Sequence, residues 1–171
     1  MRQTEQLVLR PPRPGDEERY VSLFLDPEVE AWLRPPPLAK FAESELRQML
    51  RDDVEHWESN RFGPWALEEK GGGRFVGRAG LRWTAVEGTA TVELAWTVAP
   101  ARQGRGLATE AAGAALELAR EERIEEVVAL VLPENTASRR VAEKLGLDQE
   151  AEVEHAGLPH LLYRVRPAAR S

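Results

Sequence analysis

The hydrophobic pattern changes from a period of two to a helical period around a short glycine-containing segment, and this change constrains the fold most strongly. Apolar side chains alternate along residues 91–98 and share one face of an expected strand. After Pro100 the chain has two glycines, and an alanine-rich amphipathic segment follows over residues 107–120. The sequence therefore predicts a strand, a glycine loop and a helix in direct succession.

The glycine loop has the composition of an anion site built from backbone groups. Gly104 and Gly106 allow the backbone to approach a ligand, and the start of the next helix offers unpaired N–H groups with a partial positive charge. Arg102 and Arg105 flank the loop. A dinucleotide-binding loop would have a third glycine where this chain has Thr109, and a nucleotide P-loop would have a lysine. The pattern alone leaves open a phosphate site or a plain glycine turn with solvated arginines.

The rest of the chain predicts a mixed sheet with helices on both faces. The expected strands cover residues 7–10, 65–69, 75–83, 91–98, 127–132, 150–155 and 161–166, and the expected helices cover 16–25, 27–33, 44–57, 107–120 and 136–145. Asn135 is the expected N-cap of the last helix, whose apolar stripe would be Ala137, Val141 and Leu145. A turn over residues 157–159 would join the last two strands.

Composition excludes several classes of site. The chain of 171 residues has no cysteine, so it has no disulfide, no Cys-ligated metal and no thiol nucleophile. Its three histidines lack metal-binding spacing, and we expect no metal. The net charge of −6, from 23 basic and 29 acidic residues, disfavours nucleic acid as a partner and mildly favours a cationic one. The N-terminus has no signal-like segment and the longest apolar run, residues 127–132, is too short to span a membrane, so we expect a cytoplasmic protein with no membrane partner.

Four segments in order carry a resemblance to a known family. They are VELAWTVAPARQGRGLATEA at residues 92–111, LPENTASRRVAEKLGL at 132–147, TEQLVLRP at 4–11 and DPEV at 26–29. The first strongly resembles the acetyl-CoA-binding motif of the GNAT superfamily of N-acetyltransferases, and the second resembles its next conserved stretch. The last two are similar to the branch that acetylates the N-termini of ribosomal proteins. The resemblance implies one GNAT domain over residues 1–171, with an α/β (α+β) fold and a mostly antiparallel central sheet of about seven strands.

The resemblance also implies an activity and a binding site. It implies transfer of an acetyl group from acetyl-CoA, as cosubstrate and without a metal, directly to a primary amine. The acceptor would be a protein N-terminus or a small molecule such as an antibiotic or a polyamine, and a homodimer is possible. A transferase for another acyl-CoA such as succinyl-CoA, a non-catalytic CoA sensor and a nucleotide-binding protein are alternatives. The cofactor-binding residues that it implies are Trp96, Val98, Arg102, Gln103, Gly104, Arg105, Gly106, Leu107, Ala108, Thr109, Asn135 and Arg139.

Two positions depart from the family pattern. Ala101 stands where the family often has Gln or Arg, and Ala142 stands where many members have a tyrosine that acts as general acid. The resemblance leaves Ser138 as the candidate acid, with a plain helix serine as the alternative. Asn135 would contact CoA or the acceptor as well as cap its helix. A backbone N–H near Val98 would stabilise the oxyanion that develops on the thioester.

Glu93 is the candidate general base, directly or through a water molecule. It lies on the strand face opposite the apolar side chains, just upstream of the glycine loop. The alternative is a solvated or arginine-paired carboxylate. Only a neutral amine attacks, and at pH near 7.5 neutralising a lysine costs about 4 kcal/mol whereas an α-amine costs under ~1 kcal/mol. A base is therefore more useful for a lysine acceptor than for an α-amine.

Two further groups of residues are candidates for the acceptor side. The first comprises aromatic side chains in and after the first helices, where this fold usually holds its acceptor, and the second comprises histidines of the terminal hairpin, which borders the cleft in relatives. Core aromatics and surface histidines are the alternatives. The candidates are Trp32, Trp57, Phe62 and Trp65 in the first group, and His155 and His160 in the second.

Overall fold

Eight strands and five α-helices form in residues 1–167, which are the residues that the computed structural model describes. The strands are β1 (Arg2–Gln3), β2 (Leu7–Arg10), β3 (Pro64–Glu69), β4 (Phe75–Val86), β5 (Thr89–Val98), β6 (Val127–Val131), β7 (Asp148–His155) and β8 (Leu158–Val165). The helices are α1 (Glu17–Phe24), α2 (Pro27–Leu33), α3 (Glu43–Ser59), α4 (Leu107–Glu121) and α5 (Thr136–Lys144). All the expected elements are present, and β1 is an additional strand. None of these helices has both the length and the apolar character that crossing a membrane requires.

The strands form one mixed sheet in the order β1-β2-β3-β4-β5-β6-β8-β7. All neighbours pair antiparallel except β5 and β6, which are parallel because α4 carries the chain back across the sheet between them. These two strands pair only at Val92 with Val127 and at Glu93 with Val128. The sheet therefore opens between β5 and β6 immediately after Glu93.

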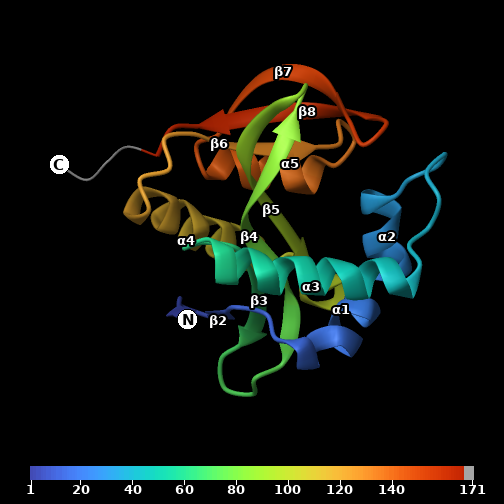
Figure 1. Cartoon of the computed structure of the whole chain (residues 1–171), viewed down its shortest axis with the longest axis vertical. Coiled ribbons are helices and arrows are strands. Elements are labelled where there is room, and N and C mark those ends of the chain that lie inside the picture. The colour runs from blue at the N-terminus through green and yellow to red at the C-terminus, as the bar shows by residue number, and fades with distance from the viewer. Residues whose placement is uncertain (168–171) are drawn as a thin grey trace.

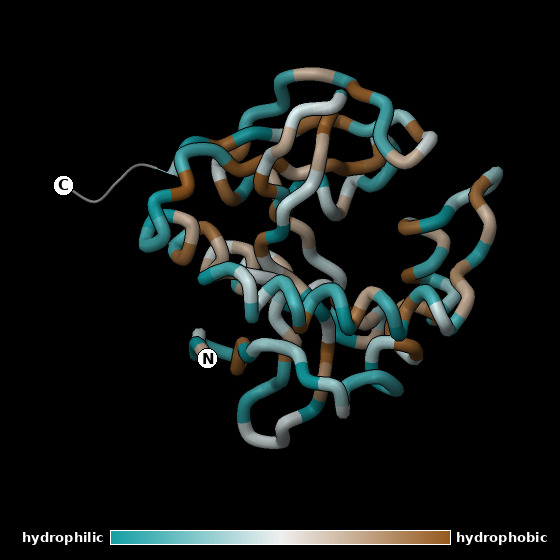
Figure 2. Tube along the Cα trace, in the orientation of Figure 1, coloured by the Kyte–Doolittle hydropathy of each residue, from teal (hydrophilic) through white to brown (hydrophobic). Residues whose placement is uncertain are grey.

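Helices cover both faces of this sheet, as the sequence predicted (Figure 1). On one face α4 packs on β4 and β5 through fully buried alanines at 111, 115 and 119, whose small side chains allow the helix to approach the strands closely. On the other face α1, α2 and α3 share a second apolar cluster that includes Tyr20 and Leu46. The hydrophobic segments of the trace gather on the interior strands, whereas outer turns are largely hydrophilic (Figure 2).

A buried ion pair joins α3 to the sheet. Arg78 on β4 donates from Nε and Nη2 to the two carboxylate oxygens of Asp53 on α3, at 2.5 and 2.6 Å. The hydroxyl of Tyr20 on α1 donates to the same carboxylate at 3.0 Å. All three side chains are buried. Burial and the neighbouring carboxylate together raise the pKa of Tyr20, so the network holds a neutral phenol beside a charged pair.

The terminal hairpin turns earlier than the sequence predicted. Ala156 and Gly157 have φ angles of 51° and 77° and form a two-residue turn, a geometry whose twist matches that of the flanking strands. The expected turn over residues 157–159 is therefore wrong, since Leu158 and Pro159 already belong to β8. The shift brings Val153 opposite His160 and His155 opposite Leu158.

The buried face of α5 also differs from the predicted stripe. Ala142 is fully buried in the main core, and Leu145 packs against that core. Ala137 is exposed and Val141 is only partly buried, so these two residues lie on a different face. The helix is short and has few apolar residues. Its sequence is therefore equally compatible with a buried face that contains Ala142 and with the predicted face, and the spacing of apolar residues does not decide between them.

We predict that replacing Asp53 with alanine destabilises the fold strongly. The substitution leaves the buried Arg78 charge without its partner, which typically costs about 3–5 kcal/mol of unfolding free energy. Urea denaturation monitored by circular dichroism measures this loss. Asp52→Ala is the matched control, because Asp52 is exposed on the same helix turn and its loss should cost less than ~0.5 kcal/mol. Equal stability of the two variants would contradict the proposed importance of the ion pair.

Candidate active-site cleft

The separation of β5 from β6 opens a cleft that reaches both faces of the sheet. Its volume is about 560 Å³, and its walls come from α1–α3 on one side and from the glycine loop, α4 and α5 on the other. In Figure 1, α2 lies across from the β7–β8 hairpin, which also contributes to the wall. Arg105 and Arg139 do not line the cleft. The other predicted site residues do: Glu93, Trp96, Val98, Arg102, Gln103, Gly104, Gly106, Leu107, Ala108, Thr109, Asn135 and Ser138.

The glycine loop forms the corner of the cleft at the start of α4. Gly104 and Gly106 have φ angles of 74° and 78°, in the left-handed region that favours glycine. A Cβ atom would meet nothing within 4 Å at either position, so the requirement is conformational rather than steric. The Glu110 N–H is the first to bond within the helix, to the carbonyl of Gly106 at 2.9 Å. The N–H groups of residues 107–109 therefore have no partner within the helix and give this corner an anion-binding character.

Glu69, at the end of β3, forms ion pairs with both loop arginines. Nη1 of Arg105 lies 2.5 Å from one Glu69 carboxylate oxygen, and Nε of Arg102 lies 3.5 Å from the other. The Gln103 side chain turns back and donates to the carbonyl of Val98 at 3.0 Å. Of the two arginines expected beside the anion, only Arg102 belongs to the cleft wall.

The N-terminus of α5 borders the same corner. Asn135 caps the helix, because its side-chain oxygen accepts the N–H of Ser138 at 3.0 Å, as the sequence predicted. The side-chain oxygen of Asn135 is thus occupied, and the side-chain NH₂ group is left to contact a ligand. The Ser138 hydroxyl has no hydrogen-bond partner among residues 1–167, and the residue lines the cleft.

The cations that α5 presents to the cleft are not those the sequence indicated. Arg139 lies away from the cleft, where its guanidinium donates to the Pro133 carbonyl at 3.3 Å and the Tyr163 hydroxyl at 3.4 Å. Arg140 and Lys144 line the cleft instead. Their spacing of four residues places them on one helix face, and this spacing was a signal in the sequence.

Glu93 lies where the two parallel strands part. Arg82 on β4 is its cross-strand partner, so both side chains stand on the same face of the sheet. Arg78 lies on that face too, opposite Thr97, and all of them line the cleft. The Glu93 carboxylate forms no ion pair within the described part of the chain, so the arginine-paired interpretation is wrong for this residue.

Most of the predicted acceptor aromatics belong to the core. Trp65 is buried and stacks against Trp57 with ring centroids 5.9 Å apart, and the Trp57 indole donates to the Pro64 carbonyl. Phe62 is also buried. Trp32 alone of the four lines the cleft, and its side chain is 46% exposed. The remainder of this apolar wall was not predicted and comprises Phe24, Val29, Leu33, Phe41 and Met49.

Both histidines of the terminal hairpin line the cleft. His155 and His160 stand on one face of the hairpin as diagonal cross-strand neighbours, with ring centroids 5.6 Å apart and ring planes at 89°. Nδ1 of His160 lies 3.1 Å from the carbonyl oxygen of Leu158. Burial lowers the pKa of His160, with a smaller contribution from His155 in the same direction, while the hydrogen bond to the Leu158 carbonyl and the negative charge of Glu93 oppose the shift. Both histidines are half-buried and border the cleft, so their role at the acceptor side stays a prediction.

The wall of the cleft is more basic than the protein as a whole. It contains Arg78, Arg82, Arg102, Arg140 and Lys144, and Glu93 is its single carboxylate among the residues that the structure describes. The acidic surplus of the chain must lie outside the cleft. No group of three or more His, Asp and Glu side chains within residues 1–167 is arranged to hold a metal ion.

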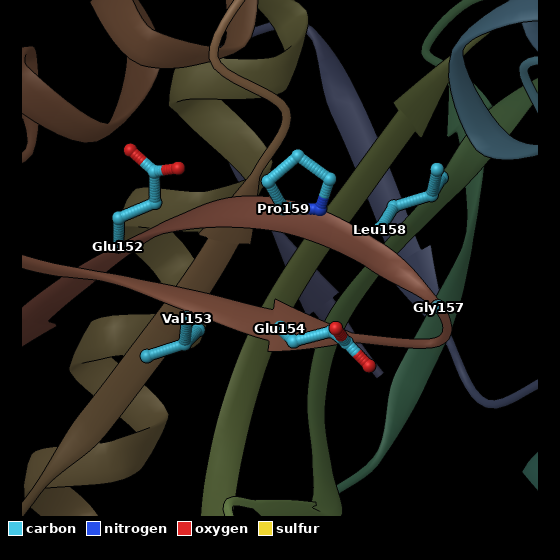
Figure 3. A pocket seen from close by; sticks show the side chains of 6 residues that line it. All are labelled: Glu152, Val153, Glu154, Gly157, Leu158 and Pro159. Carbon is cyan, nitrogen blue, oxygen red and sulfur yellow. The ribbon is translucent and has the colours of Figure 1, made fainter.

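A second hollow, of about 300 Å³, lies at the terminal hairpin (Figure 3). Glu152 and Glu154 contribute its charged side chains, and neither is a candidate from the sequence. Its other lining residues are apolar or glycine: Val153, Gly157, Leu158 and Pro159. It does not include the glycine loop or Glu93, so the chemistry that the sequence indicated belongs to the larger cleft.

The chain is similar to known acetyltransferases in both sequence and fold. A family model described as "Acetyltransferase (GNAT) domain" matches residues 6–148. The uncharacterized protein YkkB of Bacillus subtilis (strain 168) is 34% identical, with 94% of this chain and 92% of that protein covered. A putative GnaT-family acetyltransferase from Bordetella pertussis is 28% identical, with a TM-score of 0.80 over 95% of this chain and 97% of that one. Mycobacterium smegmatis RimJ, solved in complex with CoA-disulfide, shares the fold at 24% identity and a TM-score of 0.72, over 95% and 86% of the two chains.

Proposed function

This chain belongs to the GNAT acetyltransferase family, and we propose that it transfers an acetyl group from acetyl-CoA directly to a primary amine. One observation carries the proposal: the cleft that opens after Glu93 joins a backbone anion site on one face of the sheet to an unpaired carboxylate and an apolar wall on the other. A donor with phosphates and an acceptor with an amine can then meet inside the sheet. Because the sequence has no cysteine, no thiol relay is available, and the acetyl group passes from donor to acceptor in one ternary complex.

The donor half of the proposal rests on the loop and α5. Free N–H groups at the start of α4 and the left-handed glycines suit a pyrophosphate. Arg102, Arg140 and Lys144 add positive charge along the same wall. The backbone of β5 beyond Glu93 has lost β6 as a neighbour, so its outward groups other than the Val98 carbonyl, which accepts from Gln103, can bond an extended arm such as pantetheine. These features together fit CoA better than ATP or NAD, which have no comparable arm.

The acceptor half rests on the face that carries Glu93. We propose that this carboxylate attracts the ammonium form of the amine and stays beside it as its proton is lost. An α-amine needs little help in losing that proton, since its pKa is about 7.7–8. The apolar wall around Trp32 would hold the group attached to the amine. Attack of the neutral nitrogen on the thioester carbon then forms the amide bond and breaks the carbon–sulfur bond.

Three groups would assist that step. The backbone N–H near Val98 would donate to the oxygen that becomes negative during attack. The Ser138 hydroxyl would donate a proton to the sulfur, and the free amide of Asn135 would hold the CoA arm or the acceptor. Ala142 cannot supply a phenol and is enclosed in the core, so the loss of a general acid is compensated only by Ser138 or by the low basicity of the CoA thiolate itself.

A CoA-binding sensor without catalysis is the second candidate, and the buried Ala142 is the observation that favours it. A panel of amines separates the two. We expect thiol release from acetyl-CoA with at least one acceptor among α-amino peptides, lysine peptides, polyamines and aminoglycosides, with the acetylated product seen by mass spectrometry. Succinyl-CoA in a parallel series tests the acyl group. Binding of CoA, seen as a raised melting temperature, without turnover of any amine would refute the enzyme and leave the sensor.

We predict that Gly106→Asp weakens CoA binding by about fivefold to a thousandfold, because a carboxylate beside the pyrophosphate adds a repulsion of ~1–4 kcal/mol. Gly88→Asp is a closely matched control. Gly88 has a φ of 80°, close to the 78° of Gly106, and an added Cβ meets nothing within 4 Å at either position, but Gly88 lies in the remote β4–β5 turn. Isothermal titration calorimetry with CoA measures both. If the two variants bind CoA equally, the loop is not the phosphate site.

Cations on α5 provide a further prediction. Arg140→Ala and Lys144→Ala should each weaken CoA binding by about two- to fivefold, the range for exposed charge contacts, and less so at high salt. Arg139→Ala should leave CoA affinity unchanged, since its side chain is held against Pro133 and Tyr163 outside the cleft. Titration at two ionic strengths measures all three variants. A loss for Arg139→Ala larger than for its neighbour would contradict the assignment of the α5 face.

A further inference from the structure

We propose that His160 is the general base of this site and takes the proton of the acceptor ammonium on Nε2, directly or through one water molecule. The inference rests on the proposed function and names a catalytic residue for it. It replaces Glu93 in that role, and Glu93 becomes the counter-ion that stabilises the protonated histidine. His160 lines the acceptor part of the cleft from β8, across from the strand that carries Glu93.

The tautomer of His160 is set by its own hairpin. A carbonyl oxygen only accepts hydrogen bonds, so Nδ1, 3.1 Å from the Leu158 oxygen, must carry the hydrogen. In the neutral ring Nε2 is then the unprotonated nitrogen, with its lone pair available. No described residue donates to this Nε2. The ring is thus oriented as a base before any ligand arrives.

His56 shows what an inert histidine looks like in the same fold. Its Nδ1 lies 2.9 Å from the Phe62 carbonyl, and its Nε2 accepts the backbone N–H of Trp83 at 3.1 Å. Both nitrogens are therefore occupied, and the ring serves only to join α3 to β4. His160 has the first bond and lacks the second, and its free nitrogen belongs to a residue of the cleft wall.

The charged groups around His160 come from several elements. On the cleft side these are His155 on β7, Glu93 on β5, Arg78 and Arg82 on β4, and Arg140 and Lys144 on α5. Because side chains alternate along β7, the carboxylates of Glu152 and Glu154 stand on the opposite face of the strand from Val153, the cross-strand partner of His160.

Burial leaves His160 neutral at pH 7. The pKa of His160 lies below the ordinary value because burial, with a smaller contribution from His155, disfavours the charged ring more than the hydrogen bond to Leu158 and the charge of Glu93 favour it. Even with a lowered pKa, an imidazole base differs in kind from a carboxylate, because the ordinary pKa of histidine lies closer to that of an α-amine than the ordinary pKa of a carboxyl group does. Proton transfer from an ammonium to an imidazole is therefore less uphill than transfer to an ordinary carboxylate, and general base catalysis is most effective when the pKa of the base lies near the working pH.

The protons balance in this scheme. The ammonium gives one proton to Nε2 of His160 and becomes a neutral amine. The amine nitrogen forms its bond to the acetyl carbon as the carbon–sulfur bond breaks, and its second proton is lost to the sulfur. His160 returns to the neutral form by releasing its proton to solvent. No oxidant, metal or further reactant is required.

The pH dependence of turnover tests the proposal with an acceptor that the amine panel identifies. The wild-type rate should rise with pH through an acid limb below about 6.5. His160→Gln should abolish that limb and lower kcat/KM by about 10²-fold. His155→Gln should move the limb to higher pH, because His155 lowers the pKa of its neighbour, and Glu93→Gln should move it to lower pH. Glu152→Gln is the matched control for Glu93→Gln and should leave the limb in place.

Three measurements distinguish loss of the base from loss of the fold if a variant is inactive. His160→Gly tests for rescue by added imidazole, and CoA binding by each variant shows that its fold is intact. NMR titration of the three histidine rings follows the same pKa shifts without turnover. An active His160→Gln enzyme with an unchanged limb overturns the proposal and leaves the proposed function standing. If the wild-type protein binds CoA but acetylates no amine, the proposed function fails and this inference fails with it.

Discussion

Two parallel strands that stay paired at only two positions create the conditions for everything else in this site. If β5 and β6 remained bonded along their length, the sheet would separate the start of α4 from the face that holds Glu93. Because they part after Glu93, one cleft reaches both faces and the backbone of β5 gains unpaired groups. The separation also explains why the glycine loop must follow β5 at once: the anion site has to lie at the same end of the opening.

The face opposite α4 depends on a different interaction, the buried pair of Arg78 and Asp53. A buried charge pair contributes little net stability compared with apolar packing, yet removing one partner is costly. Its position suggests why a charged pair is tolerated there. Arg78 lines the cleft, and Asp53 anchors α3, while α1 and α2 of the same helical cluster carry Phe24 and Trp32 to the acceptor wall. The ion pair therefore fixes the helical cluster relative to the strand that carries Arg82 and Arg78 opposite Glu93 and Thr97.

The sequence predicted the parts of the site that depend on local conformation, and it could not predict the parts that depend on tertiary partners. The two left-handed glycines and the Asn135 cap are determined within a few residues, so the pattern was sufficient. The direction of Arg105 depends on Glu69, and that of Arg139 on Tyr163, both distant in the sequence. The prediction of an aromatic acceptor wall failed for a similar reason. Tryptophan is as suitable for a core as for a pocket wall, and Trp57 and Trp65 pack against each other in the core. The observed two-residue turn puts His155 and His160 on the same face of the hairpin, an arrangement that the expected turn over residues 157–159 would not give.

The distribution of charge along the cleft follows from these placements. Arg102, Arg140 and Lys144 gather near the anion corner, where a ligand with several phosphates would neutralise them. On the acceptor side Arg78 is already neutralised by Asp53, which leaves Arg82 and Glu93 as a pair of opposite formal charges. That half of the cleft is therefore close to neutral, although the wall as a whole is basic. An ammonium group entering it meets one carboxylate and little further stabilisation of its charge. Glu93 favours binding of the ammonium form whereas burial disfavours its charge, and a nearby neutral imidazole is placed to receive the proton.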